Sequence, residues 1–425
     1  MKLYSFPQAS EWPDIVARPV LDDASLEDVV RPVLDDVRKN GDKAVRKYTK
    51  QFDKAEIQDM FVSEREVHFA LNQVSPGLFD AIKLAAENIA TFHRQQLTQP
   101  EKIETMPGVV CWRKSIAIER VGLYIPGGTA PLFSSVLMLA IPAIIAGCSE
   151  IVLCSPPGPD GNIHPAIITA ATYIGVKKIV KAGGVQAIAA MAFGTESVPA
   201  VQKILGPGNQ YVTTAKQMVQ KYGIAIDMPA GPSEVAVFAD ETASAAFVAA
   251  DLLSQAEHGS DSQVMLVTTS EKLVAEVKAQ IDRQLNNLPR KHFAEQSLAN
   301  SKIVLVNDRN TAMDLLNRYA PEHLILACSG AAELSNKVVN AGSVFIGHYS
   351  PESVGDYASG TNHTLPTNGY ARTYSGVSVD SFVKKVTFQE LSREGLENIG
   401  AAVQRLAEAE GLQAHARAVS IRLES

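Results

Sequence analysis

The chain has 425 residues, which is more than one ordinary hydrophobic core accommodates and predicts two or more domains. Hydrophobic residues make up 46% of the chain and charged residues 20%, proportions that favour a soluble globular protein. The formal net charge of −7 argues against nucleic acid or an anionic membrane as the main partner, although it leaves room for a local basic pocket.

Neither the first residues nor the longest apolar run has the pattern of a targeting or membrane-spanning segment. Residues 1–7 lack the apolar core of a signal peptide, and the run Val136–Cys148 is short and interrupted by Pro142. The four cysteines are scattered without a C-x-x-C pair, which argues against a zinc ribbon or a disulfide framework. We therefore expect a cytoplasmic protein in which nitrogen and oxygen atoms bind any metal.

The first hundred residues have mainly helical patterns. Apolar residues recur at helical spacing in Asp23–Gly41, Asp42–Phe52 and Pro76–Gln95. This region contains no recognisable chemistry, and we interpret His68 and His93 as surface or packing residues.

From residue 116 onward, short β-type runs alternate with helical runs, which is the rhythm of a parallel sheet covered by helices. The strands expected in a first unit are Arg120–Ile125, Ile151–Cys154, Lys178–Ala182 and Val201–Leu205. Those expected in a second unit are Glu234–Phe238, Gln263–Thr268, Lys302–Val306 and Ser343–Ile346, with helices that include Thr242–Ala256 and Ala331–Asn340. A long loop, Gly347–Gly376, is followed by an expected strand at Phe382–Leu391 and one long helical run, Ser392–Val419. The pattern predicts two Rossmann-like α/β domains with small helical and strand extensions at both ends.

Glycine-rich turns follow three of the expected strands, at Pro126–Gly128, Gly183–Gly184 and Gly206–Asn209. Right-handed crossovers place such turns on one edge of a sheet, where N–H groups at helix N-termini can bind an anion. Any one of them could be a simple tight turn, but three at equivalent positions favour a ligand site. The fingerprint G-x-G-x-x-G is absent, because Tyr211 stands where the third glycine would be. Spacing alone is therefore weak evidence for NAD.

The stretch Ser254–Ser262 lies at the end of an apolar helical run. If that helix continues to His258, the side chains of Gln255 and His258 project from the same face, and Gly259 ends the helix. An amide oxygen and an imidazole nitrogen converging there could begin a metal site. The alternative is an ordinary polar helix end.

Three further segments contain groups suited to chemistry. Glu322 and His323 could divide proton transfer and water activation, although neighbours on an extended strand point to opposite sides. Asp356, in a glycine-flexed loop with His363, could supply a hard oxygen ligand or simply cap a turn. Ser233 lies between the two units, where it could contact a ligand or serve only as a connector.

Several long runs occur in the order and form in which they occur in a known family. These runs are residues 121–128, 206–209, 227–234, 252–263, 321–324 and 342–364. Together they resemble the histidinol dehydrogenases over essentially the whole chain. The resemblance implies a homodimeric, zinc-dependent enzyme of histidine biosynthesis. It would oxidise L-histidinol to L-histidine through L-histidinaldehyde and reduce two NAD⁺.

The resemblance also implies residue roles. One Zn²⁺ per subunit would be bound by Gln255, His258, Asp356 and His415. In the catalytic pair, His323 would be the general base and Glu322 would activate water. Substrate contacts would include Ser233, His363 and Glu410 in addition to the metal ligands and the catalytic pair. NAD contacts would include Tyr124, Gln186 and Asn209. The C-terminal segment would cross to the partner subunit, so that Glu410 and His415 complete the neighbouring site.

The expected division of the chain follows from the same reading. Residues 22–118 and 233–376 form the domain with the metal and catalytic residues, and residues 119–232 form the NAD-side domain. Residues 1–21 and 377–395 form a small extension domain, and residues 396–425 form a helical dimerisation segment. Two alternative interpretations are less favoured. A zinc hydrolase does not need two glycine-turned α/β units, and the metal-like cluster and the absence of a signal-peptide pattern argue against a two-lobed binding protein.

Overall fold

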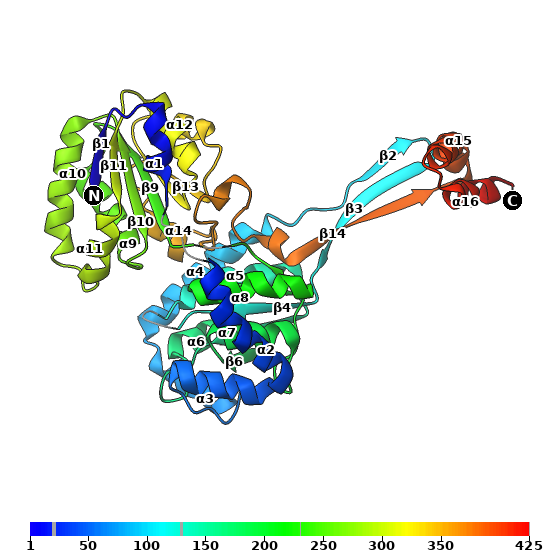
Figure 1. Ribbon diagram of the computed structural model, residues 1–425, viewed down its shortest axis with the longest axis horizontal. Coiled ribbons are helices and arrows are strands. Elements are labelled where there is room, and N and C mark those ends of the chain that lie inside the picture. The colour runs from blue at the N-terminus through cyan, green and yellow to red at the C-terminus, as the bar shows by residue number, and fades with distance from the viewer. Residues whose placement is uncertain (19–22, 128–130, 230, 425) are drawn as a thin grey trace.

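The computed structural model describes residues 1–18, 23–127, 131–229 and 231–424 of the chain. Two α/β units lie next to each other, and a long arm projects away from them and ends in two helices (Figure 1). Gly128 and Ala230, which belong to two of the segments singled out above, lie outside the described residues, as does the expected domain boundary between residues 21 and 22.

The first unit is a five-stranded parallel sheet in the order β6-β5-β4-β7-β8. Its strands are β4 (Arg120–Tyr124), β5 (Glu150–Ser155), β6 (Lys178–Lys181), β7 (Lys203–Leu205) and β8 (Ala225–Ile226). Its connecting helices are α5 (Phe133–Ala146), α6 (Pro165–Tyr173), α7 (Gly184–Phe193) and α8 (Gln210–Val219). The chain order reverses between β4 and β7, and ligands of such sheets bind beyond the carboxyl ends of the strands at this point.

Three helices from the first hundred residues complete this unit. They are α2 (Asp23–Tyr48), α3 (Glu64–Gln73) and α4 (Pro76–Arg94). α2 packs on α7 and α8, α3 on α6, and α4 on α5. The apolar faces predicted from helical spacing are the buried ones, with Val37 on α2 and Ile89 on α4 fully buried. Gly41, with φ of 51°, interrupts α2 where the sequence predicted a break.

The second unit is a six-stranded parallel sheet in the order β1-β11-β10-β9-β12-β13. Its strands are β1 (Lys2–Ser5), β9 (Glu234–Ala239), β10 (Gln263–Thr268), β11 (Lys302–Leu305), β12 (His323–Ala327) and β13 (Ser343–Ile346). Its main helices are α9 (Ala245–Ala256), α10 (Glu271–Leu285), α11 (Lys291–Ala299) and α12 (Arg309–Tyr319). β9, β10 and β12 are buried along their whole length, as expected when helices cover both faces of a parallel sheet.

The arm is a three-stranded antiparallel sheet in the order β14-β3-β2. Its strands are β2 (Lys102–Met106), β3 (Val109–Ala117) and β14 (Val383–Leu391), and the helices at its tip are α15 (Arg393–Ala409) and α16 (Gln413–Glu424) (Figure 1). Large apolar side chains of the arm are exposed, namely Ile103, Leu391, Leu406, Leu412 and Ile421. The arm therefore presents an apolar surface that this chain leaves uncovered.

Short elements complete the chain. They are α1 (Trp12–Val16), α13 (Ala331–Leu334), α14 (Glu352–Tyr357), a π-helical turn at Thr49–Asp53 and 3₁₀ turns at Ala9–Glu11, Gln220–Tyr222, Ser335–Lys337, Tyr370–Arg372 and Val379–Phe382. Within the part of the chain that the structure describes, no helix is both long and apolar enough to span a membrane.

The predicted fold class is confirmed, and α9 ends at Ala256 as expected. The helix does not continue to His258, which lies in the turn beyond it. Two predictions about helices were wrong. The helix expected at Ala331–Asn340 is a single turn followed by a 3₁₀ turn. The single run Ser392–Val419 is two helices, because Gly411 has φ of 74° and ends the first. Strand β12 and the hairpin β2–β3 were not predicted at all.

The expected grouping of segments into domains also differs from the contacts. β1 pairs with β11 in the six-stranded sheet, whereas residues 1–21 were expected in a separate extension. The helices of residues 23–94 pack on the five-stranded unit, whereas residues 22–118 were expected with the other one. Both differences involve contacts between segments far apart in the chain, and local periodicity does not report such contacts.

Candidate active site

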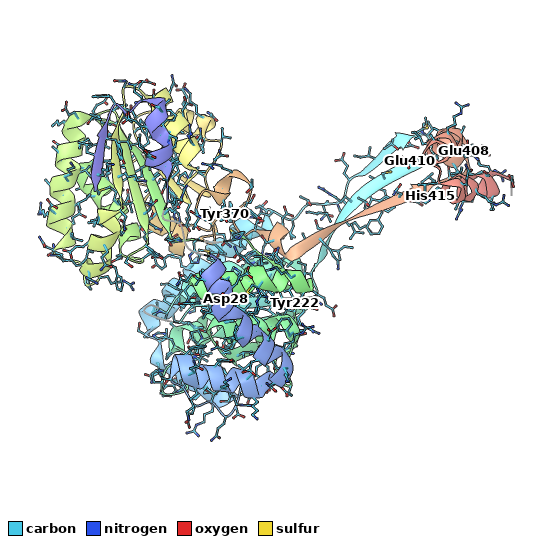
Figure 2. All side chains as sticks on the ribbon, viewed as in Figure 1. Asp28, Tyr222, Tyr370, Glu408, Glu410 and His415 are labelled. Carbon is cyan, nitrogen blue, oxygen red and sulfur yellow. The ribbon has the colours of Figure 1, made fainter. Side chains whose placement is uncertain are left out.

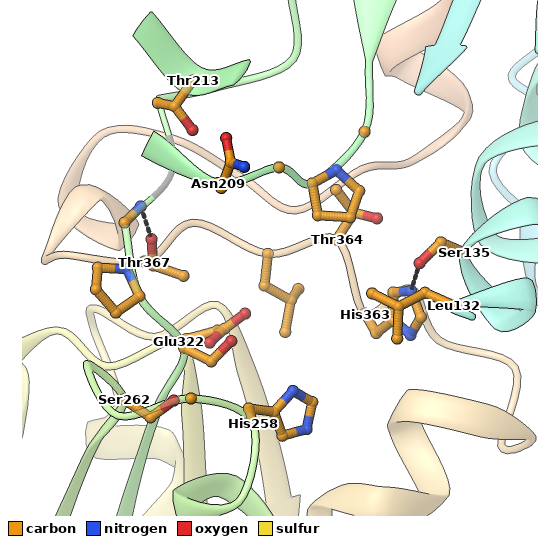
Figure 3. Close-up of a pocket in the computed structure, with 18 of the residues that line it drawn as sticks. Leu132, Ser135, Asn209, Thr213, His258, Ser262, Glu322, His363, Thr364 and Thr367 are labelled. Atoms are coloured by element: carbon orange, nitrogen blue, oxygen red, sulfur yellow. Dashed lines mark hydrogen bonds between the residues drawn. The ribbon is translucent and has the colours of Figure 1, made fainter. Parts of the chain in front are cut away.

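A cavity of about 530 Å³ lies between the two α/β units. One wall is the turn Gly206–Asn209 at the carboxyl ends of the five-stranded sheet, and the opposite wall contains Ser233, Glu322 and His323. Glu322 and His258 face Asn209 across this cavity (Figure 3). In the six-stranded sheet the site lies at the amino ends of β9 and β12, which the rule for parallel sheets does not predict.

The backbone of Glu234 holds both members of the expected catalytic pair. The Glu234 N–H donates to Glu322 Oε2 at 2.8 Å, and the Glu234 carbonyl oxygen lies 3.1 Å from His323 Nδ1. Glu322 Oε2 and His323 Nδ1 are 3.7 Å apart. The backbone bends at Glu322, and β12 begins only at His323, so the two side chains do not alternate as on a regular strand.

The environment shifts the protonation of both groups. Burial raises the pKa of Glu322, because the carboxylate loses its hydration, while the nearby His323 opposes this shift. Burial alone would lower the pKa of His323, but the negative charges of Glu322, Asp356 and Glu352 outweigh it and raise this pKa. The pair is thus a buried acid and base whose proton affinities depend on their neighbours, as at sites of proton transfer.

Asp356 and His363 lie on the loop side of the cavity. Asp356 Oδ1 is 3.3 Å from His323 Nε2, and neighbouring histidines lower the pKa of Asp356 against the effect of its burial. His363 Nδ1 is 2.8 Å from the Asp356 carbonyl oxygen, and its Nε2 is 3.0 Å from Ser135 Oγ (Figure 3). Because a carbonyl only accepts, Nδ1 of His363 carries the proton and Nε2 accepts from Ser135.

Gln255 is almost fully buried in the last turn of α9. Its amide is satisfied when the nitrogen donates to Glu352 Oε1 at 2.9 Å and the oxygen accepts from the Glu234 N–H at 3.1 Å. Ser254 Oγ also donates to Glu352 Oε1, at 2.8 Å. Burial lowers the pKa of His258, which favours the neutral imidazole that binds metals.

The structure brings together three of the four predicted metal ligands. Gln255, His258 and Asp356 all line the cavity. No cluster of three His, Cys, Asp or Glu side chains in the described ranges is arranged to hold a metal ion. Glu410 and His415 are at the tip of the arm, far from the cavity of their own chain (Figure 2).

A second cavity, of about 940 Å³, adjoins the first. It begins at the carboxyl end of β4 with Tyr124 and Gly127, and it shares Asn209 and His258 with the first cavity. Its size suits a dinucleotide-sized ligand rather than a small metabolite.

The three predicted NAD residues differ in their positions. Tyr124 and Asn209 line the second cavity; Tyr124 Oη accepts from the Gly184 N–H at 3.1 Å, and Asn209 caps α8. Gln186 is fully buried behind the wall, and its Nε2 donates to Asp53 Oδ2 at 3.2 Å. Burial raises the pKa of Asp53, which also lines this cavity, to about 6.

Sequence reasoning missed four residues of this site. Glu234 anchors the catalytic pair, Arg18 forms a buried ion pair with it, Glu352 holds the Gln255 amide, and Ser135 holds His363. Glu234 adjoins the predicted Ser233, and a charged residue within an otherwise apolar strand was the available signal for it. Glu352 lies four residues before the predicted Asp356. Nothing in the local sequence marks Arg18 or Ser135.

A buried acid and base line a cavity that adjoins a larger, nucleotide-sized one, between two Rossmann-like units, and this arrangement is typical of dinucleotide-linked oxidoreductases. The family model described as histidinol dehydrogenase matches residues 16–423. A histidinol dehydrogenase of Bacteroides fragilis is 60% identical over 424 residues, which cover 100% of this chain and 99% of the relative. A chloroplastic histidinol dehydrogenase of Arabidopsis thaliana is 50% identical and covers 100% of this chain and 91% of its own.

The crystal structure of histidinol dehydrogenase from Elizabethkingia anophelis superposes with a TM-score of 0.98 at 54% identity. The match covers 100% of this chain and 98% of that one. The chain therefore belongs to the histidinol dehydrogenase family. It is an NAD-linked oxidoreductase of histidine biosynthesis, as the resemblance predicted.

Proposed function

We propose that this chain oxidises L-histidinol to L-histidine through L-histidinaldehyde, with reduction of two NAD⁺, and that Glu322 and His323 are its catalytic residues. The observation that carries this proposal is their shared anchor on Glu234, at the wall of a cavity that continues into a nucleotide-sized one. Each oxidation removes a hydride and a proton from substrate, so the site must supply a base beside the cofactor.

His323 is suited to take the alcohol proton through Nε2. Its Nδ1 faces the Glu234 carbonyl oxygen, which only accepts, so Nδ1 carries the proton of the neutral ring. Nε2 is buried, and its polar neighbour is Asp356 Oδ1 at 3.3 Å, which as a carboxylate offers it no proton. Nε2 is therefore the atom left to accept the alcohol proton. The neutral form is required, so we expect activity to rise with pH as His323 loses its proton.

Glu322 is suited to the second half of the reaction. As a carboxylate, it takes a proton from a water molecule that adds to the aldehyde carbon, and the resulting hydrate loses a hydride to give the acid. Its raised pKa makes it a stronger base than an exposed glutamate. The Glu234 N–H holds Oε2, which leaves Oε1 for the water.

The donors around the cavity fit a zinc ion that is completed by a second copy of the chain. Gln255 and Asp356 offer oxygen, and His258 offers a neutral imidazole, which together make an open set without thiolate. Glu352 holds the Gln255 nitrogen, so the amide oxygen is the atom presented to a metal. When bound, zinc would hold the nitrogen atoms of the substrate and orient its alcohol carbon, and NAD⁺ would accept the hydride.

The fourth zinc ligand, His415, and the substrate contact Glu410 would come from a partner subunit. Both lie at the tip of the arm, beyond reach of their own cavity, and the arm carries exposed apolar side chains (Figure 2). A homodimer in which each arm reaches the neighbouring site accounts for both observations. Ser233 and His363, which line the cavity, would contact the substrate.

The deciding experiment measures NADH formed per histidinol, with limiting substrate and excess NAD⁺, before and after removal of metal by a chelator. We expect two NADH per histidinol, loss of activity on chelation and recovery with zinc. A ratio of one would mean that the aldehyde escapes and that the role given to Glu322 is wrong. No NADH from zinc-loaded protein would favour a hydrolase.

A further inference from the structure

Arg18 makes a buried ion pair that the proposed mechanism does not use. Its Nε and Nη2 both bond the carboxylate of Glu234, with Nη2 at 2.8 Å from Oε2. The side chain of Arg18 is 11% exposed and that of Glu234 is 3% exposed. Because the pair is bidentate and excluded from water, removal of either partner would leave the other charge buried and uncompensated.

The same guanidinium reaches the segment that leads into the catalytic pair. Arg18 Nη2 donates to the Tyr319 carbonyl oxygen at 2.8 Å, and the guanidinium lies over the Tyr319 ring, 4.0 Å from its centroid. Ala320, the next residue, has φ of 53°, a strained conformation for a side chain with Cβ. Ala320 lies two residues before Glu322, so the turn that Arg18 supports determines the position of Glu322.

The backbone and the side chain of Glu234 thus make different sets of contacts. Its backbone N–H and carbonyl oxygen hold Glu322 and His323, while its side chain is held by Arg18 and by the Asn368 N–H at 3.1 Å. Arg18 therefore bonds the side chain of Glu234, whose backbone holds the catalytic pair. It also bonds the turn that precedes the pair.

We propose that Arg18 is a positioning residue, which clamps Glu234 and the Tyr319–Ala320 turn so that Glu322 and His323 keep their places in the cavity. This inference rests on the catalytic roles proposed above. Arg18 does not line the cavity, so it acts only through the Glu234 side chain and the Tyr319–Ala320 turn that it bonds. Displacement of a catalytic group by about 1 Å can lower a rate by about 100-fold.

The test compares the kcat and KM of four variants: Arg18→Met, Arg18→Lys, Glu234→Gln and the double variant Arg18→Met/Glu234→Gln. We expect Arg18→Met to lower kcat about 10- to 100-fold while the KM values for histidinol and NAD⁺ change less than about threefold, because binding surfaces stay in place. Arg18→Lys keeps the positive charge but not the bidentate guanidinium, so its kcat should lie between those of the wild type and Arg18→Met.

The double variant should be more active than Arg18→Met alone, because it removes the carboxylate that the single change leaves buried and unpaired.

Arg120→Met is the matched control. Arg120 also bonds a carboxylate, that of Glu150, and a backbone carbonyl oxygen, that of Ala200 at 2.7 Å, but at the amino end of β4, away from the cavity. We expect its kcat to stay unchanged.

Unchanged kcat in Arg18→Met, an equal loss in Arg120→Met, or independent effects in the double variant would each overturn the proposal. If Arg18→Met does not fold, the test is made on Arg18→Lys and Glu234→Gln, since both keep a polar pair. A lower kcat with little change in KM would support the proposal, and an unchanged kcat would overturn it. His323→Ala is measured in parallel: if it stays active the proposed catalytic pair is wrong, and if it is inactive while the Arg18 variants are unaffected, only the clamp is wrong.

Discussion

At the scale of single residues, the site depends on a few buried polar groups whose partners come from distant parts of the chain. Glu322 and His323 are neighbours in sequence, but the residue that orients both of them, Glu234, lies 88 positions before Glu322. The chemistry of the two side chains was enough to predict that Glu322 and His323 work together. Their geometry was not predictable, because an extended strand alone would have separated the two side chains.

The roles proposed for Glu322 and His323 lead to a prediction for Glu322→Gln. The amide cannot take a proton from water, so oxidation of supplied histidinaldehyde should fall by about 10²- to 10⁴-fold, which is the usual contribution of a general base. Oxidation of histidinol to the aldehyde should fall much less, because His323 is unchanged. Single-turnover NADH formation from each substrate measures this, and equal losses would contradict the assignment.

Asp53 in the second cavity leads to a prediction about stability and pH. Burial raises its pKa to about 6, so the folded chain holds this proton more tightly than the unfolded chain, and the group destabilises the fold increasingly as pH rises from about 4 through 6. Allowing for solvent screening, Asp53→Asn should raise the free energy of unfolding by about 1–2 kcal/mol at pH 8. The gain should vanish near pH 4, as measured by urea unfolding at both pH values; a gain independent of pH would exclude this cause.

At the scale of elements, the site forms where the carboxyl edge of one parallel sheet faces the amino edge of another. The glycine-rich turns of the first unit were predictable, because each follows a buried strand and precedes a helix. Gly206 shows why such a turn needs glycine: its φ is 129°, and a Cβ would lie 2.1 Å from the Tyr124 carbonyl oxygen. Lys216 supports the turn by donating to the Gly206 carbonyl oxygen at 2.8 Å.

We therefore expect Gly206→Ala to destabilise the chain by about 3 kcal/mol or more, because strain in φ adds to a steric clash with backbone that cannot move away. Gly223→Ala is the matched control. Gly223 also has a positive φ, of 85°, but nothing lies within 4 Å of the position its Cβ would take. It should cost only about 1 kcal/mol, from strain alone. Thermal unfolding compares the two, and equal losses would show that the close approach to Tyr124 is relieved elsewhere.

At the scale of the whole molecule, the two α/β units build most of a site and the arm carries the remaining predicted residues away from it. Apolar side chains are exposed on the arm, and His415 lies far from the cavity of its own chain (Figures 1 and 2). The homodimer proposed above leads to a prediction in which defects in two different chains are combined.

His415→Ala and His323→Ala should each be inactive alone, yet a mixture refolded or coexpressed as heterodimers should regain activity. In the heterodimer, the chain with intact His323 receives an intact His415 from its partner, so one site of two is complete. Random mixing makes half of the dimers heterodimers, so about a quarter of the wild-type activity should return. No recovery in verified heterodimers would show that His415 acts in its own chain or not at all.

The fold class and most strands and helices of the two units were predictable from the sequence, because hydrophobic periodicity and glycine turns are local signals. Several cavity residues, such as Glu322, His323 and Asp356, were also predictable, because the family motifs are long. Only packing in three dimensions shows which sheet β1 and the helices of residues 23–94 join, and that Arg18 reaches Glu234. These outcomes depend on contacts between distant segments, such as Lys2 with Lys302 and Arg18 with Glu234, and such contacts arise from packing rather than from local pattern.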